Sequence, residues 1–184
     1  MLITFLGPDG SGKTSLALAV SDHFPTVNYI YLGGNNNSRK YIYFNTFIKK
    51  NKSGKFYTLL KYLAIFFNNR VELSRSKKKH VVSDRSPIDE LLFTKGIRQK
   101  IHKFFHLFYK KPDLIFLLTG DETILYKRKK EISKEQILKY INSYNSYTVE
   151  NELNYLTLNT TELNLEECKS IVIKEVNKLL TNES

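Results

Sequence analysis

The sequence has little of what marks secreted or membrane-spanning proteins. A single cysteine, Cys168, among 184 residues excludes an internal disulfide and predicts an ordinary semi-buried thiol. The most apolar stretch, residues 62–67, is far shorter than the roughly 18 residues that a membrane-spanning helix needs. The first residues lack the basic leader of a secretory signal, and their apolar run stops at Gly7. We therefore expect a cytoplasmic protein without a membrane span.

Acidic residues are also scarce relative to basic ones. The chain has 29 Lys and Arg against 18 Asp and Glu, a formal net charge of +11. Such an excess can attract a polyphosphate, a nucleic acid or an anionic membrane surface, and charge alone does not choose among them. Much of it lies in short runs, at residues 49–52, 77–79 and 127–130, which are typical of solvated faces and turns. We therefore regard nucleic acid as an unfavoured partner.

The apolar pattern predicts one α/β domain over residues 1–184. Hydrophobic residues make up 41% of the chain, which is enough for a sizeable core. Short apolar runs alternate with helical patterns, which predicts a mostly parallel sheet covered by helices on both faces. The expected strands are 2–6, 27–32, 80–84, 113–119 and a weaker 154–158. The expected helices include 14–24, one or two within 40–75, one starting near Ser86, one around 97–108 and one after the last strand.

A phosphate-binding loop follows the first expected strand and opens the first expected helix. Residues 7–14, Gly-Pro-Asp-Gly-Ser-Gly-Lys-Thr, satisfy the pattern Gly-x4-Gly-Lys-Thr. In this position, backbone N–H groups and the helix dipole can converge on phosphate oxygens, and we expect the glycines because a Cβ would block that approach. Lys13 can reach the β and γ phosphates and the Thr14 hydroxyl can bind Mg²⁺. The expected cofactors are ATP and Mg²⁺, and the expected ATP-binding residues are Gly7, Asp9, Gly10, Ser11, Gly12, Lys13, Thr14 and Ser15.

The remaining motifs favour transfer to an acceptor over hydrolysis. A GTP-reading switch protein would need an Asn-Lys-x-Asp segment late in the chain, and none is present. A translocating ATPase would normally end a strand in a pair of acids, whereas Asp84 is followed by Arg85. We therefore expect a phosphotransferase with a small-molecule phosphate acceptor. Asp84 is expected to bind Mg²⁺ through water.

These motifs together resemble the thymidylate kinase-like group of nucleoside and nucleotide kinases. Residues 5–14 resemble its aspartate-bearing phosphate loop, and residues 81–86 resemble its Asp-Arg motif. Residues 111–118 resemble the strand that leads to its lid, and residues 124–130 its arginine-bearing segment. Residues 156–165 and the helix after them resemble the last strand and helix. The resemblance implies a P-loop NTPase fold, a three-layer sandwich with a five-stranded parallel sheet and a short lid near 121–134.

The resemblance also implies roles for individual residues. Asp9 would face the acceptor, and Arg85 would help to position the acceptor phosphate. Arg128 would reach over the ATP phosphates, and Arg70 would contact the acceptor base. Residues 159–160 would lie near the adenine or form a simple turn. The expected catalytic residues are Lys13, Asp84, Arg85 and Arg128; the expected substrate-binding residues are Asp9, Arg70 and Arg85; the expected metal-binding residues are Thr14 and Asp84.

Two departures from the group's pattern leave the acceptor open. The arginine-proline-glycine segment usual after the second strand is replaced by Gly-Gly-Asn-Asn-Asn at residues 33–37, and the lid is short. A hydroxyl acceptor benefits from a carboxylate base after that strand, and residues 32–35 offer none, whereas a monophosphate is already an oxyanion. This favours a nucleoside monophosphate kinase, with a thymidylate-like acceptor.

Other readings of the sequence stay possible at this point. Asp84 or Asp9 could serve a hydroxyl acceptor, so a kinase of a sugar or saccharide intermediate is one alternative. A nucleotide-dependent nucleic-acid-binding module, motivated by the net charge, is another, and a homodimer is possible. His102 and His106 share a helix face but lack a third metal ligand, so we expect solvated or semi-buried histidines. The tyrosines are expected mostly to pack, although one within 41–47 or 140–147 could stack on an acceptor base.

Overall fold

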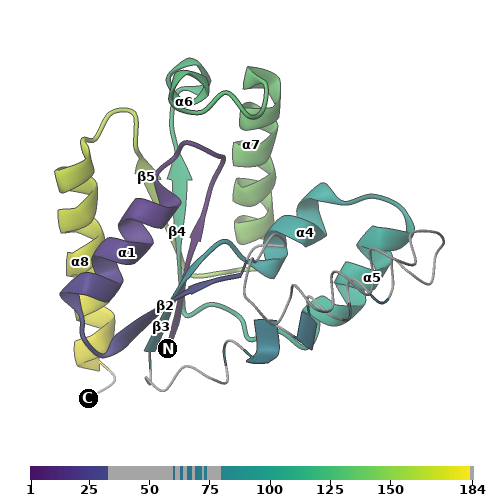
Figure 1. Cartoon of the computed structure of the whole chain (residues 1–184), viewed down its shortest axis with the longest axis horizontal. Coiled ribbons are helices and arrows are strands. Elements are labelled where there is room, and N and C mark those ends of the chain that lie inside the picture. The colour runs from purple at the N-terminus through teal and green to yellow at the C-terminus, as the bar shows by residue number, and fades with distance from the viewer. Residues whose placement is uncertain are drawn as a thin grey trace.

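A computed structural model describes residues 1–32, 60, 63, 66–67, 69–71, 73 and 80–182. Strands and helices alternate along the described chain, as the apolar pattern predicts (Figure 1). The elements are β1 (Leu2–Leu6), α1 (Lys13–His23), β2 (Val27–Tyr31), β3 (His80–Asp84), α4 (Pro87–Phe93), α5 (Ile97–His106), β4 (Leu114–Thr119), α6 (Glu122–Arg128), α7 (Lys134–Glu150), β5 (Tyr155–Asn159) and α8 (Leu165–Asn182).

The five strands form one parallel sheet in the order β2-β3-β1-β4-β5. This confirms the predicted five-stranded parallel sheet. The central strand β1 pairs with β3, and Phe5 lies opposite Asp84 in that register. Since parallel strands end at the same edge, the phosphate loop after β1 and the acid that ends β3 lie next to each other.

Helices cover both faces of the sheet, with α1 and α8 on one face and α4 and α7 on the other (Figure 1). The first face packs Phe5 and Phe116, whose rings stack at 5.0 Å, against α1 and α8. The second packs Leu6 and its neighbours in β4 against Ile88 of α4 and Tyr144 of α7. Alternate side chains of each central strand are therefore buried on opposite faces, which explains why these strands are apolar throughout. Cys168 is fully buried in the first core.

Local capping explains where the helices near the site begin. The Ser86 hydroxyl accepts a hydrogen bond from the Ile88 N–H, and Pro87 occupies the first turn of α4. Asp121 caps α6 by accepting from two backbone N–H groups. Ser133 and Gln136 form a capping box at the start of α7. The side chains on α4 and α7 are thus presented from helices with defined starts.

Some expectations fall where the structure is not described. The segment 33–37, the basic runs 49–52 and 77–79 and most of the helical stretch 40–75 lie outside the described residues. None of the helices in the described ranges has the length and apolar character needed to cross a bilayer.

Candidate phosphate-transfer site

The phosphate loop needs its glycines for reasons that lie within the protein itself. A Cβ on Gly7, where φ is 150°, would lie 2.6 Å from the carbonyl oxygen of Leu118 in β4. A Cβ on Gly10, where φ is 85°, would lie 3.0 Å from the carbonyl oxygen of Leu125 in α6. A Cβ on Gly12 would have no atom of the described chain within 4 Å other than those of its chain neighbours, but φ is 88°, which L-residues rarely adopt. Close packing thus restricts positions 7 and 10, and backbone conformation restricts position 12.

Lys13 is the first residue of α1, and its side chain folds back across the loop. Its Nζ donates to the carbonyl oxygen of Pro8 at 2.7 Å and lies 3.8 Å from Asp9 Oδ1. The side chain is 7% exposed. Burial, with a further contribution from the nearby Arg85, lowers the pKa of Lys13. A phosphate anion in the loop would supply negative charge that stabilises this buried ammonium.

The hydroxyl and carboxylate expected at the metal site are in contact. Thr14 Oγ1 donates a hydrogen bond to Asp84 Oδ2, and Asp84 is 2% exposed at the end of β3. Mg²⁺ prefers such hard oxygen ligands and usually keeps several waters besides substrate phosphates. In the described chain no group of three or more His, Cys, Asp or Glu forms an all-protein metal cage. The donor set therefore fits a magnesium ion held mainly by water and nucleotide.

Arg85 stands between two carboxylates directly after β3. Its guanidinium donates to Asp9 Oδ1 at 2.6 Å and lies 3.8 Å from Asp89 Oδ2. Although burial opposes its charge, Asp9 and Asp89 outweigh that effect and raise the pKa of Arg85. Its φ of 69° is uncommon for a residue with a side chain and stores strain of about 1 kcal/mol or more. The contacts to the two carboxylates hold the guanidinium between the phosphate loop and α4.

The two carboxylates beside Arg85 differ in their proton affinity. Burial would raise the pKa of Asp9, but Arg85 and Lys13 outweigh it, so the pKa is lowered. Burial dominates at Asp89 and raises its pKa to about 6, against the opposing effects of Arg85 and of the Tyr144 hydroxyl. That hydroxyl donates to Asp89 Oδ1 at 2.8 Å. Asp9 is thus a fixed anion, whereas Asp89 titrates close to neutral pH.

A cavity of about 190 Å³ opens beside these charges, and we call it the acceptor cavity. Its lining includes the charged side chains of Asp9, Arg85 and Asp89 and the aromatic rings of Phe93 and Tyr140. Those two rings stack with centroids 4.0 Å apart. The cavity therefore joins a charged end next to the phosphate loop to an aromatic end.

The sequence patterns pointed to only part of this cavity. The sequence left open that a tyrosine within 140–147 stacks on a base, and Tyr140 and Tyr144 line the cavity. Asp89 and Phe93 were missed. Their signal was present, because a helix that starts at Pro87 places Asp89 one turn after Arg85 and Phe93 one turn further on.

Arg128 ends α6, and its head group is bound to the loop after β5. One guanidinium nitrogen donates to the carbonyl oxygen of Thr160 at 2.8 Å, and the other to its hydroxyl at 3.4 Å. The base of the side chain lies over the phosphate loop, since a Cβ on Gly10 would be 3.5 Å from Arg128 Cβ. Asn159 Oδ1 accepts from the Thr161 N–H, so this loop forms a turn. The structure thus brings the expected lid to the edge where β1, β4 and β5 end.

The other expected residues lie apart from the acceptor cavity. Arg70 is exposed and donates to the carbonyl oxygen of Phe108 at 2.9 Å, after the end of α5. Ser15 is exposed on the first turn of α1. His106 Nε2 is 2.6 Å from the Tyr147 hydroxyl oxygen, whereas His102 Nε2 is 3.8 Å from Glu90 Oε2. The two histidines thus have separate partners.

Comparisons with known proteins show that this fold is similar to that of solved P-loop kinases. No protein-family model and no curated protein sequence matches the chain. A structure of deoxyadenosine kinase from M. mycoides, with dCMP and dCDP bound, matches with a TM-score of 0.67 at 15% identity, over 97% of this chain and 100% of that one. The same kinase with dATP matches with a TM-score of 0.63 at 15% identity, over 96% and 100%.

Thymidylate kinase from Ehrlichia chaffeensis also matches, with a TM-score of 0.57 at 22% identity, over 98% of both chains. At such identities the likeness establishes the fold. The predicted three-layer P-loop fold, and the resemblance of this chain to that group of kinases, are confirmed at that level.

Proposed function

We propose that this protein is an ATP-dependent kinase that transfers the γ-phosphate to a nucleoside monophosphate. The observation that carries the proposal is the position of Arg85. Its guanidinium lies at the charged end of the acceptor cavity and bonds Asp9 of the phosphate loop. A cation at the junction between the two sites can hold an acceptor phosphate in line with the donor.

On the donor side, the proposal assigns the triphosphate to residues 7–15. Backbone N–H groups of the loop and the Lys13 ammonium would bind the phosphates. Thr14 and Asp84 would hold Mg²⁺, which when bound neutralises charge that develops on the transferred group. Arg128 would add a cation from the lid at 121–134 after leaving Thr160. These residues position and stabilise, and the protein supplies little covalent chemistry.

On the acceptor side, the proposal places the base against the aromatic end of the cavity. Phe93 and Tyr140 offer ring faces, and stacking is tolerant of base identity. The similarity to a solved thymidylate kinase supports such an acceptor. The single domain with a short lid, and a possible homodimer, belong to the same proposal.

A second candidate acceptor is a nucleoside, and Asp89 favours it. A hydroxyl acceptor needs a base whose pKa lies near the working pH. The Asp89 carboxylate lines the cavity, and burial raises its pKa to about 6. The sequence patterns offered no such base after the second strand, and α4 supplies one. The similarity to deoxyadenosine kinase structures points in the same direction.

One assay tests both candidates. ADP formation from ATP and Mg²⁺ is followed with dTMP, dUMP and other monophosphates, and in parallel with thymidine, deoxyadenosine and deoxycytidine. The proposal expects turnover with a monophosphate, and turnover confined to nucleosides would replace it by the second candidate. Absence of turnover in both panels would contradict an acceptor of this class.

A further inference from the structure

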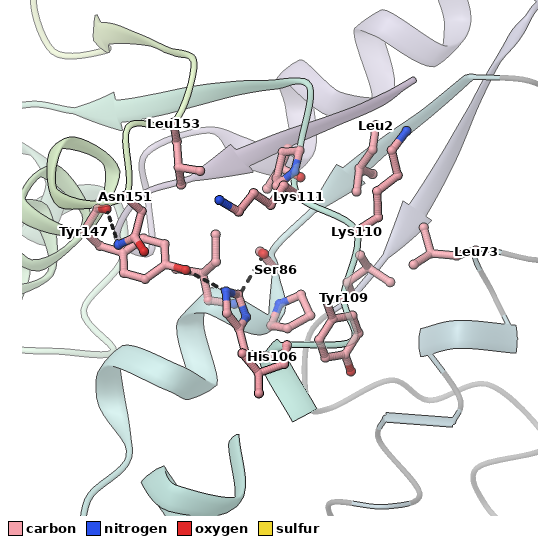
Figure 2. Close-up of a pocket in the computed structure, with 16 residues that line it drawn as sticks. Leu2, Leu73, Ser86, His106, Tyr109, Lys110, Lys111, Tyr147, Asn151 and Leu153 are labelled. Atoms are coloured by element: carbon pink, nitrogen blue, oxygen red, sulfur yellow. Dashed lines mark hydrogen bonds between the residues drawn. The ribbon is translucent and has the colours of Figure 1, made fainter. Parts of the chain in front are cut away.

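A second cavity lies on the α4 and α7 face of the sheet, away from the phosphate loop. It has a volume of about 260 Å³ and is enclosed by the ends of α5 and α7, the first turn of α4 and the start of β1 (Figure 2). The described residues that line it and those that line the acceptor cavity have no member in common. Residues 86–88 line this second cavity, whereas Asp89, Glu90 and Phe93 of α4 line the acceptor cavity.

Most of the wall of this second cavity is apolar, with Leu2, Leu32, Leu73, Ile88 and Leu153 among the lining residues. An apolar cavity of about 150 Å³ is known to hold a benzene molecule. This larger cavity can therefore hold one ring together with a short substituent.

Lys111 lines this apolar space, and the residue as a whole is solvent-exposed. Figure 2 shows the Lys111 side chain directed inward, toward Leu153 and Tyr147, whereas Lys110 extends away past Leu2. Lys110 Nζ is 3.1 Å from Asp113 Oδ2, and within the described chain no carboxylate pairs with Lys111. Both lysines are exposed, but they differ in pairing, because Lys110 has a carboxylate partner and Lys111 has none among the described residues.

The other polar groups at this wall are already engaged or neutral. The Tyr147 hydroxyl is bonded to His106 Nε2, as the dashed line in Figure 2 marks. Burial, with a further contribution from Lys111, lowers the pKa of His106, so the imidazole is neutral at physiological pH. The Asn151 amide donates to the Tyr147 carbonyl oxygen at 2.9 Å. Lys111 is therefore the group that selects the charge of a ligand.

We propose that this cavity is a second ligand site that binds a small organic anion with one ring, whose acidic group pairs with Lys111. The proposal does not depend on the reaction at the phosphate loop. Since Ser86 and Ile88 line this site while Arg85 and Asp89 line the other, a ligand here would contact the turn that carries the acceptor-cavity charges.

The probe is 3-phenylpropionate, and its neutral amide serves as the control ligand. Binding to the full chain is measured by ligand-observed NMR titration. For about 11 non-hydrogen atoms, we expect a dissociation constant on the order of 1 mM. The amide should bind about tenfold more weakly because it lacks the charge-assisted contact.

Two matched variants locate the site. Lys111→Gln should weaken binding of the acid about tenfold, to the level of the amide, whereas Lys110→Gln should leave it within about twofold. Leu153→Trp should fill the cavity and abolish binding of both probes. If this variant does not fold, the comparison of Lys111→Gln with Lys110→Gln still tests the proposal. Equal effects of the two lysine variants, equal affinity for acid and amide, or no binding at about 10 mM would overturn the proposal.

Discussion

The phosphate loop and the acceptor cavity meet at Asp9, yet they are held in shape by different means. The loop is fixed by its backbone, through positive φ angles and close contacts with β4 and α6. The cavity is fixed by side chains, through the Arg85 ion pairs and the hydrogen bond from Tyr144 to Asp89. Backbone constraints are the same in every state of the loop, whereas side-chain networks can change with substrate or pH. The difference suggests why the donor is easier to identify than the acceptor.

The largest expected effect comes from the donor side. Lys13→Ala should lower kcat/KM for ADP formation by about 100- to 1,000-fold, because it removes the cation that the buried loop places on the phosphates. Lys169→Ala is the matched control, since Lys169 pairs with Glu166 on α8, far along the chain from the loop. Steady-state kinetics and circular dichroism check activity and folding, and a folded Lys13→Ala enzyme with activity near wild type would contradict the assignment.

The backbone constraint is sharpened by comparing two glycines. Gly7→Ala should lower the free energy of unfolding by about 3 kcal/mol, since its Cβ meets a backbone carbonyl that cannot move aside. Gly12→Ala should cost only about 1 kcal/mol, because strain in φ acts there without a clash. Urea denaturation of both variants measures the difference, and an equal loss would show that packing against β4 does not constrain the loop.

The side-chain network should show itself as a pH dependence of stability. Burial raises the pKa of Asp89 from 3.8 to about 6, so the folded state holds a proton that the unfolded state has released. Stability from this group is fully present below pH 3.8 and is lost as the pH rises through about 6. Between pH 4.5 and 7, this group should lower the free energy of unfolding of the wild type by about 2 kcal/mol. The Asp89→Asn variant should not show that decline.

Urea denaturation at several pH values compares wild type with that variant, and parallel curves would contradict the shifted pKa. The same variant separates the two acceptors. If a nucleoside is the acceptor, loss of the base should lower kcat about 100-fold, whereas a monophosphate acceptor should feel a smaller effect.

Two arginines give the last contrast, in which Arg85 should have a large effect and Arg70 the smallest effect of all. Arg85→Ala should raise KM for the acceptor about 100-fold, because a charge-assisted contact to the phosphate is lost. Arg70→Ala should change KM by less than about twofold, since surface contacts of this kind contribute little. If the Arg70 variant raised KM as much as the Arg85 variant, the result would support the contact between Arg70 and the acceptor base that the family resemblance implies.

The sequence predicted the sheet and the phosphate loop because their signals are local. A buried parallel strand reads as a continuous apolar run, and Gly7 to Thr14 carry their pattern in eight consecutive positions. The acceptor cavity could not be predicted in the same way. It joins Phe93 of α4 to Tyr140 of α7, which are brought together only by packing of two helices on one sheet face.

The contacts of long side chains could not be predicted from the sequence either. Arg128 was placed near the lid by its motif, but its bond to Thr160 depends on how β4 and β5 align. The raised pKa of Asp89 depends on burial beside Tyr144, which no spacing rule gives.

The central claim is that residues 7–15 hold a triphosphate. Its most direct test is a crystal structure of the protein with a non-hydrolysable ATP analogue and Mg²⁺. The account predicts phosphate density within the loop, with Lys13 Nζ moved from Pro8 onto phosphate oxygens. A nucleotide bound elsewhere, or an empty loop at saturating nucleotide with Lys13 still on Pro8, would contradict it.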